Sequence, residues 1–261
     1  MLITYKNPGF EHSISSILLF QEDGTAPFWS EALIHFYPQI KKAKLDSLSA
    51  AEKKVYLTQE LSCIWNEISS ELERKEEAYN AHFIKHHRRI EDALSEAFDI
   101  DTRAIFNDLV GNICLNPICP RFLNERYFDI FYKNSERGAL GLSLHEIIHY
   151  LWFHVWNGHF GDDYFEYETP SLKWILSEAV VESIMSDERL ASINPYFPRE
   201  NGGCVYPYFQ NMIICDEPIL DTLMRMHRSN GITDYMELSY GYFLEHEAAI
   251  RRHIEEAEKT F

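Results

Sequence analysis

The stretch Leu140-Gly141-Leu142-Ser143-Leu144-His145-Glu146-Ile147-Ile148-His149-Tyr150-Leu151-Trp152-Phe153, residues 140–153, is the most informative part of the sequence. Apolar residues occupy almost every side of the helix that we expect from about Ala139 to Trp156, and a helix that is apolar all round is buried. Its few polar side chains are Ser143, His145, Glu146, His149 and His154. Because buried ionisable groups need partners, the sequence predicts a polar site inside the core.

The spacing of the two histidines indicates a metal site. His145 and His149 are four residues apart, so they point the same way from adjacent helical turns. Neutral imidazole is a good zinc ligand, and zinc lowers the pKa of a bound water to about 7. A neighbouring carboxylate can accept the proton of that water. The pattern therefore predicts His145 and His149 as ligands of Zn²⁺ and Glu146 as general base.

A catalytic zinc needs a third protein ligand. The metzincin continuation is excluded, because it requires Gly and His where the chain has Trp152 and Val155. A second apolar helix, expected from about residue 171 to 185, carries Glu178 and Glu182 on one stripe. Two carboxylates on an apolar stripe repel each other unless a cation lies beneath them. We assign Glu178 as the third ligand, and Glu182 as the acceptor of a hydrogen bond from a ligand histidine.

Other interpretations of these residues are open at this stage. The two histidines could be core residues that the two glutamates satisfy without metal, or Glu178 and Glu182 could face solvent. Alternative ligands lie in the loop after the first helix, namely His159, Asp162 and Asp163. Side chains that could stabilise an oxyanion are Tyr206, Tyr208, Arg225, His227 and Tyr240.

The segment HEIIH, followed 29 positions later by the glutamate of SEAVVES, resembles the gluzincin branch of the zincin metallopeptidases, the thermolysin-like group. The resemblance covers about residues 127–185. It implies a zincin-like core that cleaves peptide bonds with zinc, held by His145, His149 and Glu178, and with Glu146 as general base. Glu182 stands where that family commonly has Asp.

The resemblance also implies that a β-strand edge before the first helix binds the substrate backbone. Two segments could supply it. Residues 127–132 are aromatic and β-branched, which is typical of a strand. Residues 112–118 contain Pro117 and read as extended chain or an edge strand.

The remainder of the chain looks mostly helical, so we expect an α+β fold with a small mixed sheet. Helical patterning runs from about Pro27 to Ala97, and Ser49 with Glu52 forms a helix-start signal. We expect a helical N-terminal region over 1–110 and a zincin-like region over 111–261, or one continuous domain. Residues 194–207 should form a long loop.

Composition limits the partners. The net charge of −17 disfavours nucleic acid and anionic membranes. No apolar run approaches the length of a membrane span, and we expect no secretory leader. The five cysteines are odd in number and scattered, which does not indicate a disulfide framework. We therefore expect a cytoplasmic zinc metallopeptidase with a peptide or protein substrate. The alternatives are a non-catalytic binding or regulatory protein with a structural or vestigial metal site, and an acidic mimic of nucleic acid.

Overall fold

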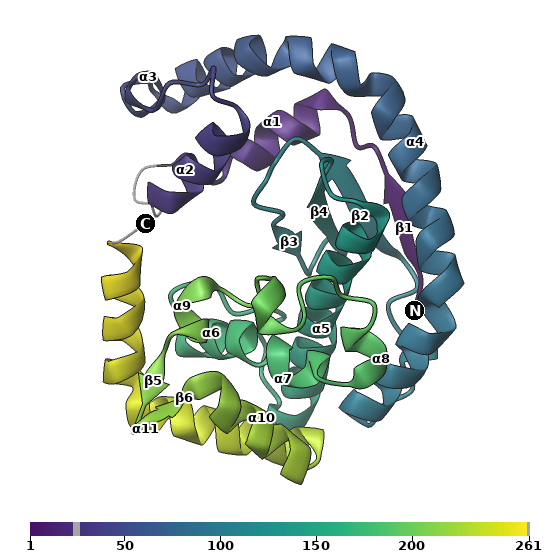
Figure 1. Ribbon diagram of the computed structural model, residues 1–261, viewed down its shortest axis with the longest axis vertical. Coiled ribbons are helices and arrows are strands. Elements are labelled where there is room, and N and C mark those ends of the chain that lie inside the picture. Colours follow the sequence, from purple (N-terminus) through teal and green to yellow (C-terminus); the bar gives the residue numbers. More distant parts are fainter. Residues whose placement is uncertain (23–26, 260–261) are drawn as a thin grey trace.

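The computed structural model describes residues 1–22 and 27–259, without the side chains of residues 27 and 28. It is an α+β fold, mostly helical, with a small mixed sheet (Figure 1). The α-helices are α1 (Phe10–Leu18), α2 (Pro27–Phe36), α3 (Lys42–Asp46), α4 (Ala50–Phe98), α5 (Glu136–Phe160), α6 (Leu172–Ala179), α7 (Val181–Met185), α8 (Glu188–Ala191), α9 (Pro207–Gln210), α10 (Ile219–Ser229) and α11 (Ile232–Glu258). The strands are β1 (Ile3–Lys6), β2 (Leu109–Cys114), β3 (Arg121–Phe122), β4 (Tyr127–Phe131), β5 (Ile213–Ile214) and β6 (Glu217–Pro218).

The larger sheet has the strand order β1-β2-β4-β3 within the described part of the chain. β1 pairs parallel with β2 and β2 pairs parallel with β4, whereas β3 pairs antiparallel with β4. The strand expected over 127–132 is therefore confirmed as β4, and only the first half of 112–118 is strand. Neither is an edge: β2 and β4 are the two inner strands, so our expectation of a free edge there is wrong.

The long helix α4 arches around the sheet and packs against β1 and α5 (Figure 1). Its start is the expected one, because Glu52 accepts a hydrogen bond from the backbone N–H of Ser49 at 2.9 Å in a capping box. Leu57, Leu61 and Leu72 of its apolar stripe are fully buried, whereas Ile64 and Trp65 are partly buried. The helical region expected over residues 27–97 is thus divided among α2, α3 and α4.

The helix α5 passes through the middle of the molecule (Figure 1). It is longer than expected at both ends. Ser135 caps its start by accepting a hydrogen bond from the N–H of Gly138 at 3.0 Å. Gly161 ends it in the left-handed conformation, whereas Gly158, which lies beyond the end that we expected at about Trp156, is still helical.

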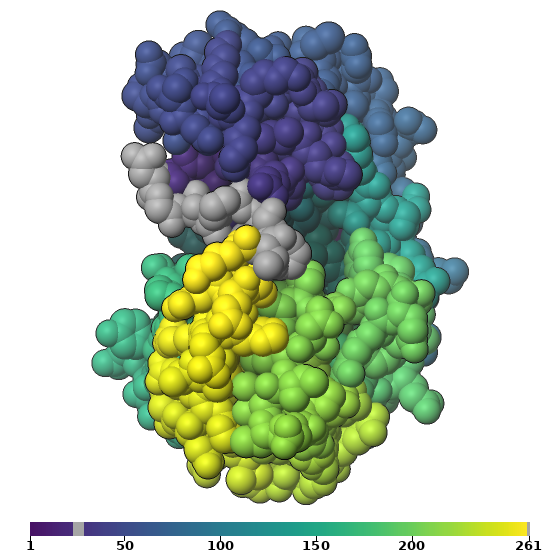
Figure 2. Space-filling model, turned by 60° about the vertical axis from the view of Figure 1, so that its left-hand side comes forward, coloured from purple at the N-terminus to yellow at the C-terminus, as the bar shows by residue number. Residues whose placement is uncertain are grey.

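The surface in Figure 2 divides into an upper part formed by N-terminal residues and a lower part formed by C-terminal ones. One hydrophobic core nevertheless runs through both, from Met1 and Ile3 to Phe243 and Ile250. The sheet is also shared, because β1 from the N-terminal region pairs with β2. Of the helices that the structure describes, none is long and apolar enough to cross a membrane.

Candidate metal centre

The helix α5 carries three of the expected site residues into the core. The His149 side chain is fully buried and Glu146 is 5% exposed, while His145, one turn earlier, is partly open. The apolar residues on the remaining sides of α5 hold it in the core, among them Leu144, Ile147 and Ile148. The sequence-based expectation of a buried helix with polar groups inside the core is therefore met.

Glu178 approaches α5 from the neighbouring helix α6. Ser171 caps the start of α6 by accepting a hydrogen bond from the N–H of Trp174 at 3.1 Å. Ile175 and Leu176 pack into the core, which leaves Glu178 2% exposed beside the two histidines. A carboxylate this deeply buried needs positive charge or hydrogen-bond donors close to it.

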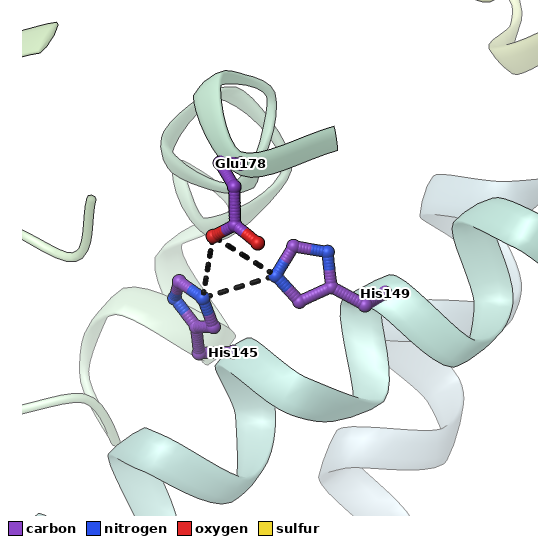
Figure 3. A group of neighbouring side chains, drawn as sticks. All are labelled: His145, His149 and Glu178. Atoms are coloured by element: carbon purple, nitrogen blue, oxygen red, sulfur yellow. Dashed lines mark hydrogen bonds and ion pairs between the residues drawn. The ribbon is translucent and has the colours of Figure 1, made fainter. Parts of the chain in front are cut away.

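The ligand atoms of the three residues converge (Figure 3). The Nε2 atoms of His145 and His149 are 3.0 Å apart, and they lie 3.6 Å and 3.5 Å from Oε2 of Glu178. Zinc–nitrogen bonds of 2.0–2.1 Å at tetrahedral angles put neighbouring ligand atoms about 3.4 Å apart. The triangle therefore has the dimensions of three corners of a tetrahedral site, and this group can hold a metal ion.

The outer ring nitrogens decide which atom each histidine offers. Nδ1 of His145 donates a hydrogen bond to the backbone carbonyl of Cys204 at 2.8 Å. That bond fixes the tautomer whose Nε2 lone pair points to the centre. Nδ1 of His149 is buried and has no hydrogen-bond partner among the described residues. An arrangement with the proton on that Nδ1 likewise leaves Nε2 of His149 free for a metal.

Glu182 does not take the role that we assigned to it. The second helix is interrupted at Val180, so Glu178 belongs to α6 and Glu182 to α7. Arg199 donates from Nε to Oε1 of Glu182 at 2.7 Å. We expected Glu182 to accept a hydrogen bond from a ligand histidine. The backbone carbonyl of Cys204 accepts that bond from His145 instead.

A buried cation that sequence reasoning missed lies beside the centre. Arg121 of β3 donates from Nη1 to Oε1 of Glu178 at 2.8 Å and from Nε to Glu166 at 2.8 Å. The same Nη1 lies 3.8 Å from Oε2 of Glu146. Arg121 therefore joins the carboxylates of three separate segments, and it leaves the Oε2 atom of Glu178 directed at the histidines.

Burial and neighbouring charge set the protonation of the group. Burial raises the pKa of Glu146 to about 7, although His145 and Arg121 oppose the shift. Burial also raises the pKa of Glu178, but His149 and Arg121 outweigh it and hold that pKa well below its usual range. Without metal, Glu178 is thus ionised at neutral pH, whereas Glu146 is close to half-protonated.

The pKa values of the two histidines shift in opposite directions. Burial lowers the pKa of His149 to about 3, and Arg121 adds to the effect. Burial also opposes the charged form of His145, but the carboxylates of Glu178 and Glu146 raise its pKa above the usual value. His149 is therefore neutral at neutral pH, which is the form that binds a metal.

The centre opens into a cavity of about 960 Å³. His145, Glu146, Glu178 and Arg121 line one part of it. The rest is formed by segments from the N-terminal, central and C-terminal parts of the chain, including Leu19, Phe20, Trp29, Trp174, Tyr206, Tyr208, Ile254 and Glu258. A metal held by three protein ligands here would face this cavity with a coordination position open, which is typical of catalytic rather than structural zinc sites.

Two of the three alternative ligands have other partners, and His159, which we expected in the loop, still belongs to α5. His159 pairs with Glu237 at 2.9 Å, and Asp162 accepts from Nε1 of Trp156 at 2.7 Å. Asp163 is exposed. These three residues are not part of the convergent group.

Two of the five side chains considered for an oxyanion line the cavity, Tyr206 and Tyr208. The other three point elsewhere: Arg225 pairs with Glu217, His227 packs on Tyr235 and Tyr240 packs on Trp156. The sequence did not predict the roles of Arg121, Glu166 and the Cys204 carbonyl, because no local spacing distinguishes these residues. The only available signal was an arginine immediately after Pro120 in an otherwise apolar and aromatic segment.

No protein-family model, curated protein or solved structure matches this chain significantly.

Proposed function

We propose that the chain is a zinc-dependent hydrolase that cleaves peptide bonds. The observation that carries the proposal is the convergence of Nε2 of His145, Nε2 of His149 and Oε2 of Glu178 within 3.6 Å of one another. Glu146, the residue after His145, is buried and lines the same cavity. The His-Glu-x-x-His helix with a downstream glutamate ligand is the arrangement of the gluzincin-type peptidases that the sequence resembles.

Zinc, when bound, would supply a water of lowered pKa and would polarise the substrate carbonyl. The residues of the chain supply the proton transfers. Oε2 of Glu146 is buried and has no hydrogen-bond partner among the described residues, so it is available to a ligand in the cavity. A pKa of about 7 suits Glu146 to accept a proton near neutral pH and to return it to the leaving nitrogen.

Arg121 acts as a positioning residue in this proposal. Its hydrogen bond to Oε1 of Glu178 leaves Oε2 as the atom that would bind a metal. Groups that orient a ligand in this way are worth about 10–100-fold in metal affinity. Arg121 belongs to β3, the edge strand of the sheet next to the cavity, and we propose β3 as the strand that pairs with the substrate backbone.

Tyr206 is our choice for the oxyanion donor. It lines the cavity, and burial together with the charge of Glu178 raises the pKa of its hydroxyl well above the usual value. It therefore keeps its proton and can donate a hydrogen bond to a developing negative charge. Tyr206→Phe should lower kcat by about 10²–10³-fold if the hydroxyl has this role.

The direct test is Glu146→Gln. Glutamine has almost the shape of glutamate and cannot accept the proton, so the variant should bind one zinc per chain and lose hydrolysis. Cleavage of a peptide library would be followed by mass spectrometry, with zinc content measured on the same samples. Glu237→Gln, which changes an exposed partner of His159, is the matched control and should cleave like wild type. A fully active Glu146→Gln protein would exclude this mechanism.

A second candidate function is a non-catalytic binding or regulatory protein with a vestigial site. Arg121 supports it, because a guanidinium 2.8 Å from Glu178 supplies positive charge without any metal. The two candidates differ in a measurable way. The hydrolase binds zinc stoichiometrically, whereas a vestigial site, whose carboxylates Arg121 alone neutralises, stays metal-free in zinc-containing buffer.

A further inference from the structure

The cavity has an aromatic wall next to the metal centre. The rings of Tyr206 and Tyr208 are stacked, with centroids 5.2 Å apart and planes 5° apart. Trp174 lies 6.1 Å and Trp29 lies 6.3 Å from the Tyr206 ring, and all four side chains line the cavity. Aromatic faces attract cations that come within about 6 Å of the ring centroid. Such a wall accommodates an apolar stem that ends in a positive charge.

Two carboxylates line the same cavity. Glu255 and Glu258 are three residues apart on α11, and neither has an ion pair with any residue that the structure describes. Burial raises the pKa of Glu258, and the charge of Glu255 adds a smaller effect in the same direction. The nearby Arg251 does not neutralise them, because it bonds to Glu247 at 2.7 Å and to the carbonyl of Pro170 at 2.7 Å.

An independent observation also indicates room for a ligand. Tyr208 is only 6% exposed and lines the cavity, yet its hydroxyl makes no hydrogen bond within the described residues. The hydroxyl oxygen is not among the fully buried atoms without a partner, so it is accessible from the cavity and can accept a hydrogen bond from a ligand there. Tyr208 is close enough to Glu258 for that carboxylate, after burial and Glu178, to raise its pKa. The hydroxyl and the carboxylate therefore belong to one polar end of the cavity.

We propose that this part of the cavity binds the basic side chain, lysine or arginine, of a peptide. The aliphatic stem packs against the Tyr206–Tyr208 wall, and the charged end lies between Glu255 and Glu258 and donates to the hydroxyl of Tyr208. The net charge of −17 favours the approach of such peptides. That the bound peptide is a substrate rests on the proposed function, whereas the binding preference does not.

The preference is tested with blocked peptides, acetylated at one end and amidated at the other, so that only side chains carry charge. A randomised blocked hexapeptide pool is captured on the zinc-loaded Glu146→Gln protein and sequenced by mass spectrometry. We expect lysine and arginine to be enriched at one position. Dissociation constants then compare the best peptide with versions that carry norleucine or glutamate there. Lysine should bind at least tenfold more tightly than norleucine, and the advantage should shrink in 1 M salt.

Two variants locate the subsite. Glu258→Gln should reduce the preference for lysine over norleucine by about tenfold, and Tyr208→Phe by about threefold. Glu256→Gln is the matched control, because Glu256 is exposed on the same helix and does not line the cavity. It should leave the preference unchanged. An unblocked norleucine peptide that bound as tightly as the blocked lysine peptide would show that the cation is an N-terminal amine, and it would overturn the inference.

The inference is also overturned if no basic residue is enriched, if no peptide is captured, or if Glu258→Gln retains the full preference. These outcomes are separate from the failure of the proposed function. A lysine preference in a wild-type protein that cleaves nothing would leave the subsite standing and remove the hydrolase. Cleavage without any preference for basic residues would support the hydrolase and remove the subsite.

Discussion

Alanine substitutions at two glycines of α5, Gly141 and Gly158, should differ in their effect on the stability of the protein. Gly141 lies one turn before His145, where α5 approaches the chain at Asn194 and Pro195. A Cβ built on Gly141 would lie 2.6 Å from Cδ of Pro195 and 2.7 Å from Oδ1 of Asn194. A Cβ on Gly158, further along the same helix, meets nothing within 4 Å.

The magnitude follows from two opposing terms. Both substitutions gain about 1 kcal/mol, because alanine favours the helix interior more than glycine does. Only Gly141→Ala pays for overpacking, which typically costs about 1–3 kcal/mol where a rigid group such as a proline ring must move. The propensity gain cancels in the comparison. Gly158→Ala should therefore be more stable than Gly141→Ala by about 1–3 kcal/mol, or about 2–4 °C in Tm per kcal/mol.

Urea unfolding of the two variants and wild type, followed by tryptophan fluorescence and circular dichroism, measures the difference. Gly158→Ala should be at least as stable as wild type, with an unchanged dependence on urea. If Gly141→Ala proved as stable as Gly158→Ala, α5 would not approach the 194–195 segment as closely as described. The wall of the cavity next to His145 would then be wrongly placed.

Two further predictions concern the charges of the centre. Arg121→Met should destabilise the metal-free protein by about 3–5 kcal/mol in urea unfolding, because it leaves buried carboxylates without their cation. The control Arg126→Met breaks an exposed ion pair with Asp108 and should change stability by less than about 0.5 kcal/mol. Equal effects of the two substitutions would contradict the buried network around Arg121. Zinc affinity, measured by competition with an indicator from pH 8 to 5.5, should be full above the raised pKa of His145 and fall about tenfold per pH unit below it, because a proton on His145 must leave before metal binds. Affinity that did not change with pH would show that His145 is not a ligand.

Local pattern was sufficient to predict the helix that carries the site. The residues of α5 are apolar on nearly every side, which places the helix in the core whatever surrounds it. Within it, the spacing of His145 and His149 fixes their common direction. Ser49 and Glu52 marked the start of α4 for a similarly local reason, since both partners of the capping box lie within one turn.

Contacts between distant segments were not predictable in the same way. Arg121 reaches Glu178 across 57 residues of sequence, and no spacing rule relates the two. Glu182 follows Glu178 by one turn, so a continuous helix predicted that both would serve the same metal site, Glu178 as ligand and Glu182 as the acceptor of a hydrogen bond from a ligand histidine. The break at Val180 and the approach of Arg199 from another segment gave it a different one. Strand order is non-local as well, so the inner positions of β2 and β4 could not be read from their composition.

The most direct test of the central claim is the zinc content of the purified protein. Wild type, His149→Ala, Glu178→Ala and His154→Ala would be equilibrated with zinc, freed of excess metal and measured by elemental analysis, with circular dichroism to check folding. His154 is the control, because it lies on the same helix but is exposed and packs against Phe106. We predict one zinc per chain in wild type and His154→Ala, and none in His149→Ala and Glu178→Ala. A metal-free wild type, or full zinc content in folded His149→Ala, would contradict the three-ligand centre.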